Sequence, residues 1–188
     1  MENTDSMLGW HWLRNDKRLR YRDGDEVDDG EIVEAGSTYV AEGPIELCRN
    51  GMHASARALD ALEYAPGEIV CYVRLEGELQ HDTTKSVGRS RTVLWMVDAS
   101  DTLHEFACWC AAQALSRERD AGREPDARSW AAIEAKRRWL AHEISDDELA
   151  AARAAASDAA WAARDAAWDA QNAELERRLM DLAQGEEQ

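Results

Sequence analysis

The feature that most constrains the fold is the tetrapeptide Asp-Ala-Ala-Trp, which occurs at residues 158–161 and again at residues 165–168. The seven-residue spacing is close to two helical turns, so both copies fall on the same side of one helix. The run from Leu149 to Leu182 places its alanines along one stripe and its large apolar side chains along the opposite stripe. The large side chains of the repeat region are Trp161, Trp168 and Leu175. The pattern predicts a long helix over residues 146–184 with two apolar faces.

A helix that is apolar on two opposite sides needs two neighbours, whereas a surface helix needs only one. Its start is marked by the capping-box pattern of residues 145–148. The helix is either packed inside a bundle of its own domain or shared with another molecule, and the sequence leaves both alternatives open. In the second case the interaction surface comprises the large side chains of one stripe and the acidic residues flanking it. These candidates are Trp161, Trp168, Leu175, Asp158, Asp165 and Asp169.

The rest of the chain predicts an α+β fold. Short β-branched and aromatic segments, separated by Gly, Asp and Pro, predict a mixed β-sheet in the first half, with one inserted helix over residues 56–65. The expected strands cover residues 8–13, 37–40, 45–48, 69–75 and 92–97. Further on the apolar period becomes helical and predicts helices at about 101–118 and 125–142 before the long one. The predicted domains are a β-rich domain, residues 1–98, and a helical region, residues 99–188, that packs on it.

The formal charge of −16 at pH 7 limits the partners of the chain. An acidic surface repels phosphates and anionic headgroups, so we expect no direct nucleic-acid or membrane binding, and attraction to basic partners instead. No apolar run approaches the roughly 18 residues of a membrane span, and the polar start argues against a signal peptide, which predicts a cytoplasmic location. The acidic stretch from Asp23 to Glu34 contains no basic residue. It is either a solvated loop or an imitation of a phosphate track.

The best candidate for a chemical site is the segment from Cys48 to Ser55. Here a glycine turn at Gly51 is expected to deliver His53 and Ser55 to the start of a helix, where free backbone amides can hold an anion. His53 is the candidate catalytic residue, as a general base, and the alternatives are a hydrogen-bonding pocket residue and a packed ring.

A basic cluster at residues 85–91 adds Arg89 and Arg91 as ligand-binding candidates. These arginines would either accept an acidic group of a ligand or neutralise neighbouring carboxylates. The spacing of His and Cys residues matches no strong zinc pattern, so we expect neither a metal nor a cofactor. The four cysteines are too sparse for a disulfide framework and are predicted to be reduced thiols.

The segment Cys48-Arg-Asn-Gly51-Met-His53-Ala-Ser55 also carries a family resemblance. Together with Gly9-Trp-His-Trp12 and Arg91-Thr-Val-Leu-Trp95, it resembles an uncharacterised family of small proteins encoded by tailed bacteriophages and prophages. Members of that family carry a Cys-x-x-Gly-Phe-His-Ala-Ser turn, with an aromatic residue where this chain has methionine, and often end in an Ala-Ala-Trp-rich helix. The resemblance covers about residues 8–115. It implies a phage setting and no established activity.

A second resemblance concerns the order of elements. The turn at residues 51–54, a helix carrying Ala61 and Tyr64, and the strand at 69–75 look like the middle of ADP-ribosyltransferase folds, where such elements line a nicotinamide pocket. His53 stands where that family uses tyrosine, and no glutamate matches the catalytic one.

Three function hypotheses follow from these observations. The first is a non-enzymatic phage accessory protein that binds a host or phage protein, with inhibition of a host defence system as one form, or that self-associates through the C-terminal helix. The second is an ADP-ribosyltransferase-like or nucleotide-binding module centred on residues 51–55. The third is an acidic nucleic-acid mimic based on residues 23–34.

Overall fold

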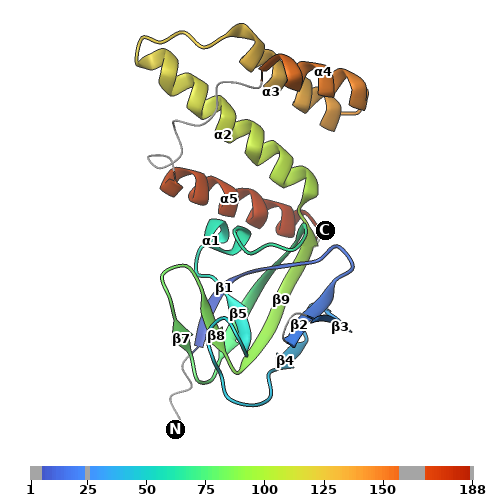
Figure 1. The fold of residues 1–188 in the computed structure, drawn as a ribbon, viewed down its shortest axis with the longest axis vertical. Coiled ribbons are helices and arrows are strands. Elements are labelled where there is room, and N and C mark those ends of the chain that lie inside the picture. Colours follow the sequence, from blue (N-terminus) through green and yellow to red (C-terminus); the bar gives the residue numbers. More distant parts are fainter. Residues whose placement is uncertain (1–5, 24–25, 157–167, 187–188) are drawn as a thin grey trace. The chain divides into compact units, whose positions relative to one another are not determined.

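The computed structural model describes residues 6–23, 26–156 and 168–186 (Figure 1). The chain has an α+β fold, as the sequence predicted: antiparallel sheets and one short helix are followed by helices α2–α5. The predicted strands at 8–13, 69–75 and 92–97 correspond to β1 (Ser6–Leu13), β6 (Ile69–Glu76) and β9 (Ser90–Asp98). The predicted helix at 56–65 is the shorter α1 (Ala58–Leu62).

The largest sheet has the strand order β1-β6-β9-β4, where β4 covers Thr38–Val40. A second sheet has the order β5-β8-β7, and a two-stranded sheet pairs β2 with β3. The bounds of these strands are β5 Met52–Ala54, β8 Ser86–Gly88, β7 Gln80–His81, β2 Arg18–Asp23 and β3 Glu26–Ile32. Every pairing among the described strands is antiparallel, not mixed as predicted. Parallel pairs need long crossover connections, usually helical, and this half of the chain has only one short helix among its described residues.

Strand β6 lies inside the main sheet, and its residues 69–73 are buried or partly buried on both faces, which explains the nearly continuous apolar sequence there. On one face Cys71, Val73 and Leu75 join a core with residues of the second sheet. On the other face the ring of Tyr72 lies 5.0 Å from that of Trp10 and 5.7 Å from that of Trp95. This aromatic row crosses three neighbouring strands because the register places the three residues opposite one another.

Two segments differ from the sequence prediction. Residues 45–48 are not a strand, because Glu46 and Asn50 bridge across a tight turn in which Cys48 has a φ of +66°.

The acidic stretch is not a loop. Most of it forms β3, which pairs with the arginine-bearing strand β2 so that Arg20 stands opposite Asp29 in the backbone register. The signal missed there was the alternating arginines of the preceding strand.

The chain divides into two compact units, Met1–Ser100 with Leu175–Gln188, and Asp101–Glu174. We refer to them as the β-rich unit and the helical unit. The described residues 175–186 thus group with the β-rich part, whereas the sequence placed them in the helical region. The predicted helix at 146–184 corresponds to two described helices, α4 (Asp146–Ala156) and α5 (Trp168–Glu186), and residues 157–167 lie outside the described part.

The C-terminal half of α5 contributes to the β-rich unit. Leu175 and Leu179 are fully buried. A carboxylate oxygen of Glu176 accepts a hydrogen bond from the backbone amide of Ala58 over 3.0 Å, so α1 and this part of α5 lie side by side (Figure 1). Ala58 is the first residue of α1, whose N-cap residue Arg57 makes no side-chain cap. The glutamate therefore supplies the acceptor that a helix start needs.

The helical unit is built from α2 (Ser100–Asp120), α3 (Ala127–Leu140) and α4. Helix α3 is capped by Asp126, whose carboxylate accepts from the amide of Arg128. The predicted capping box is confirmed: the Ser145 amide donates to Glu148 over 2.9 Å, and the Glu148 amide donates to the Ser145 hydroxyl over 3.3 Å. None of the helices in the described ranges is long and apolar enough to cross a membrane.

Candidate functional site

The turn at Gly51 leads into strand β5, not into a helix. Gly51 has a φ of +128°, a backbone conformation that residues with a side chain rarely adopt. His53 then pairs with Val87 of β8, and the backbone of Ser55 bridges Trp10 of β1 through bonds of 2.7 and 2.9 Å. The anion site predicted at a helix start is therefore not formed here, because α1 begins three residues beyond Ser55 and its first amide already donates to Glu176.

Both ring nitrogens of His53 bond to the backbone of its own loop. Nδ1 lies 3.0 Å from the carbonyl oxygen of Gly51, and Nε2 lies 3.1 Å from the amide nitrogen of Cys48. The Cys48 amide can only donate, so Nε2 accepts and Nδ1 carries the proton. Burial is the main cause that lowers the pKa of His53, with smaller contributions from Arg91 and Lys85, while the Gly51 bond opposes them. The ring is neutral and fastens the turn of residues 46–50 to β5.

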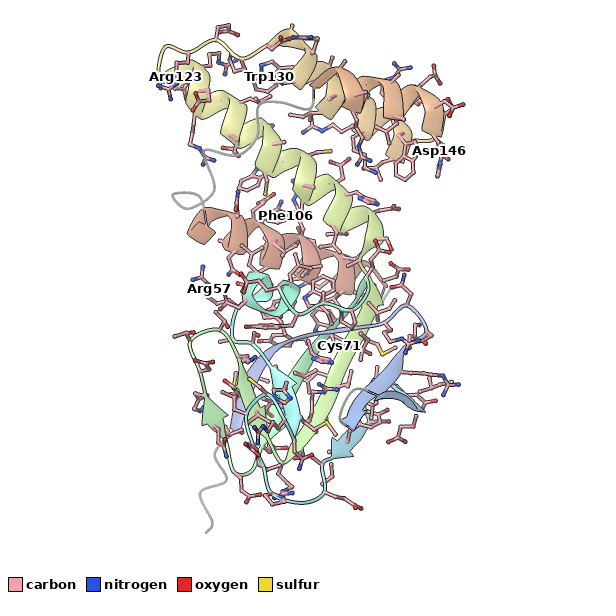
Figure 2. The ribbon with its side chains drawn as sticks, viewed as in Figure 1. Arg57, Cys71, Phe106, Arg123, Trp130 and Asp146 are labelled. Carbon is pink, nitrogen blue, oxygen red and sulfur yellow. The ribbon has the colours of Figure 1, made fainter. Side chains whose placement is uncertain are left out.

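Arg91 lies deep in the β-rich unit, with 3% of its surface exposed, and its Nη1 donates to the carbonyl oxygen of His53 over 2.9 Å. The structure thus brings together two of the predicted ligand-binding residues. His11 of β1 joins them: its pKa is held well below the usual value by burial and then by the charges of Arg91 and His53. His11 stands opposite Cys71, which is buried in the sheet (Figure 2). Its place on the core-facing side of an alternating strand was the sequence signal that could have identified it.

Arg89 has different partners. Its Nε donates to Glu78 over 2.7 Å and its Nη2 donates to the same carboxylate. Its Nη1 donates to the carbonyl oxygens of Ala41 and Gly43 over 2.9 and 2.6 Å. The side chain therefore ties two loops together and neutralises a carboxylate, which is the second of the two roles considered for the basic cluster.

Ser55, the remaining candidate of this segment, is buried. Its backbone fastens β1 to the end of β5, and Gly9 makes that approach possible, since a Cβ at Gly9 would lie 2.6 Å from the Ser55 carbonyl oxygen. Within the part of the chain that the structure describes, no three His, Cys, Asp or Glu side chains converge as metal ligands.

The interaction candidates of the C-terminal region have three different placements. Leu175 is fully buried and contributes to the fold of the β-rich unit. Trp168 and Asp169 open α5, but their side chains are outside the described set. The predictions for Asp158, Trp161 and Asp165 fall on residues 157–167, which lie outside the described residues.

One known family model matches just under half of the chain. Residues 19–105 match the model of a family described as a domain of unknown function (DUF7666). The match runs from β2 into α2 and includes the turn at Gly51, His53 and both arginines. This part of the chain is therefore similar to an uncharacterised domain family, and the description names no activity. Neither a curated protein nor a solved structure matches the chain.

Proposed function

We propose that the protein is a phage-encoded accessory protein that acts by binding another protein, and that the helical unit carries the binding surface. The observation that best supports this proposal is the small hydrophobic core of the helical unit. Its described residues bury only four apolar side chains, Phe106, Cys108, Ile133 and Leu149. Burial of apolar surface is the main stabilising contribution to a folded unit, and other large apolar side chains of these helices, such as Leu103, Trp109 and Trp130, are only partly buried. A partner could bury what they leave open.

Partly buried tryptophans contribute to that surface. The ring of Trp109 on α2 stacks on Phe106 at a centroid distance of 6.0 Å, and the guanidinium of Arg119 lies 5.7 Å from the ring of Trp130 on α3. Both tryptophans are only partly buried, and Figure 2 shows Phe106 and Trp130 on their helices. Tryptophan and arginine are the residue types most enriched among those that dominate binding energy at protein interfaces.

Charge favours a basic protein as the partner. At −16 the chain attracts positive surfaces and repels nucleic acid. A nucleic-acid mimic is less well supported, because the main chain of the acidic strand β3 pairs with β2, whose sequence contains three arginines and so does not form a purely acidic track. The resemblance to phage and prophage proteins supports a partner of host or phage origin in the bacterial cytoplasm, including a component of a host defence system.

Affinity capture from infected host cells tests this proposal. We expect the full chain to retain a protein that cross-links to the helical unit. The Trp130→Ala variant should retain at least about tenfold less of that protein, which corresponds to a loss of roughly 1.4 kcal/mol of binding energy. The matched control is Val40→Ser, which removes an exposed apolar side chain from the edge of the main sheet. Circular dichroism of both variants confirms that they fold.

Equal retention by the two variants would contradict a helical binding surface, and absence of any specific protein would contradict the function itself. If the purified chain forms a dimer that Trp130→Ala dissociates, the partner is a second copy of the chain.

A nucleotide-binding function is the second candidate, and the grouping of His11, His53 and Arg91 favours it. Two neutral imidazoles beside a guanidinium form a set that could hold an anionic group, in the segment whose order of elements resembles ADP-ribosyltransferase folds. A dinucleotide such as NAD⁺ would then raise the melting temperature at saturating concentration, and Arg91→Lys would weaken the effect. No rise in melting temperature with the nucleotide would remove this candidate.

A further inference from the structure

Lys136 is a lysine held inside the helical unit. It lies on α3, and only 9% of its surface is exposed. Its ammonium nitrogen is 3.6 Å from the ring centroid of Trp139, about one turn further along the same helix, which is a close cation–π contact. The long stem of the lysine is therefore buried while its charge rests on an aromatic face. The charge of this side chain thus has a fixed position.

Trp139 is itself held in place from two other helices. Its indole Nε1 donates over 2.7 Å to a carboxylate oxygen of Asp146, the first residue of α4, which is labelled in Figure 2. The ring of His104 on α2 meets the indole edge-on, at a centroid distance of 5.8 Å and an interplanar angle of 84°. The aromatic face under the ammonium is preorganised, so a group that binds there does not have to order it first.

The next two cations of α3 have carboxylate partners, whereas Lys136 has none among the described residues. Nε of Arg137 lies 3.9 Å from a carboxylate oxygen of Glu105, and Nε of Arg138 lies 3.3 Å from one of Glu143. Within the described ranges no carboxylate or other acceptor forms an ion pair or a hydrogen bond with the Lys136 ammonium. Burial is the main cause that lowers the pKa of Lys136. Buried lysines are almost always paired, because a charge taken out of water without a counter-ion is unfavourable, so this site calls for an anion from outside the described chain.

We propose that Lys136 and the ring of Trp139 form a binding site for a carboxylate that an acidic side chain of the partner protein supplies, an inference that rests on the proposed function. A carboxylate suits the site better than a phosphate, since a chain with a charge of −16 repels a dianion more strongly than a monoanion. The methylene groups of an acidic side chain also pack on the indole ring beside the ammonium. In an otherwise basic partner, one carboxylate placed here fixes the orientation of docking, because both groups stay unpaired in any other orientation.

The substitution Lys136→Met tests the site, because methionine keeps the buried stem and removes the charge. In affinity capture we expect this variant to retain at least about tenfold less of the partner protein, since the partner's carboxylate then stays buried without a cation. The melting temperature of the free chain should be unchanged or higher, because the free chain loses a buried charge that has no counter-ion. The matched control is Arg138→Gln, which removes the same charge from a side chain already paired with Glu143 and should leave retention unchanged.

Zero-length cross-linking with a carbodiimide, which joins an amine to a carboxylate in contact with it, identifies the lysine involved. The chain has three lysines, Lys17, Lys85 and Lys136, and we expect the cross-link to the captured protein at Lys136. Equal retention by Lys136→Met and Arg138→Gln, or cross-links at the other two lysines alone, would overturn the site and leave the proposed function intact. A lower melting temperature of Lys136→Met would also overturn it, by showing that the ammonium is stabilised within the chain. Absence of any captured protein contradicts the proposed function, and this inference with it.

Discussion

Replacing Gly51 with alanine tests the backbone geometry on which the candidate site depends. Gly51 combines two features, a φ of +128° and a crowded surrounding. A Cβ at this position would overlap the Cγ2 methyl group of Val87 and lie 3.2 Å from the carbonyl oxygen of Gly88. Val87 is itself fully buried in the core, so it has little room to move away.

The expected loss has two parts. Holding an alanine in a backbone conformation used almost only by glycine costs about 1–3 kcal/mol. Forcing a methyl group into a packed core costs about 1–3 kcal/mol more. The sum, about 2–6 kcal/mol, is comparable with the whole stability of a typical domain. Gly36→Ala is the matched control: Gly36 has a φ of +85°, and a methyl group there would meet no atom within 4 Å, so only the backbone part applies.

Urea denaturation followed by circular dichroism gives the free energy of unfolding for both variants. Hydrogen exchange at the amides of β5 and β8 shows whether the loss is local to that sheet. We expect Gly51→Ala to be less stable than Gly36→Ala by about 1–3 kcal/mol, the packing part alone. Equal losses would refute the argument, because they would show that the surroundings of Gly51 relax without cost.

Three further predictions concern other parts of the chain. Leu179→Ala should lower the free energy of unfolding of the β-rich unit by about 2–5 kcal/mol in urea titration, whereas its exposed neighbour, in Met180→Ala, should change it by under about 1 kcal/mol. Ser145→Ala should cost about 1 kcal/mol in the helical unit, measured by hydrogen exchange of α4, because it removes one half of the capping box. The lowered pKa values of His11 and His53 mean that the unfolded chain binds protons first as pH falls below about 6.5, so stability decreases from there downward. His11 contributes up to about 1.4 kcal/mol of this loss per pH unit, and the partly exposed His53 contributes less. In His53→Gln the free energy of unfolding should therefore fall less steeply between about pH 7 and 5.5. An unchanged pH profile would contradict the neutral state of His53.

The parts of the fold that the sequence predicted are those in which one local signal decides the structure. The continuous apolar run of β6 follows from burial on both faces, and the start of α4 follows from Ser145 and Glu148. Short strands with weak patterns were not predicted. The sequences of β2 and β3 contain so many charged residues that they resemble a loop. In the structure the two strands nevertheless pair through their main chains, a pairing that side-chain composition does not indicate.

The segment of the candidate site was assigned the wrong local structure. The sequence shows a glycine followed by His53 and Ser55, and this is compatible with a helix start or with a strand. What decides between them is the pairing of β5 with β8, a partner more than 30 residues away, and the bridge to Trp10. Long-range pairing of this kind leaves little trace in the local period of apolar residues. The alternation of β1 could have placed His11 on the core-facing side, but only the folded sheet brings it near Arg91.

Leu175 shows why an apolar stripe does not by itself identify an interface. On a helical wheel it continues the stripe of Trp161 and Trp168, and a helix with two apolar stripes has a face to spare. In the structure Leu175 and Leu179 are fully buried, and Glu176 between them caps α1. The second apolar stripe of this helix segment is therefore used within the chain, where the β-rich unit needs a cover beside its short helix. A stripe is available to a partner only where the chain has no element of its own to bury it.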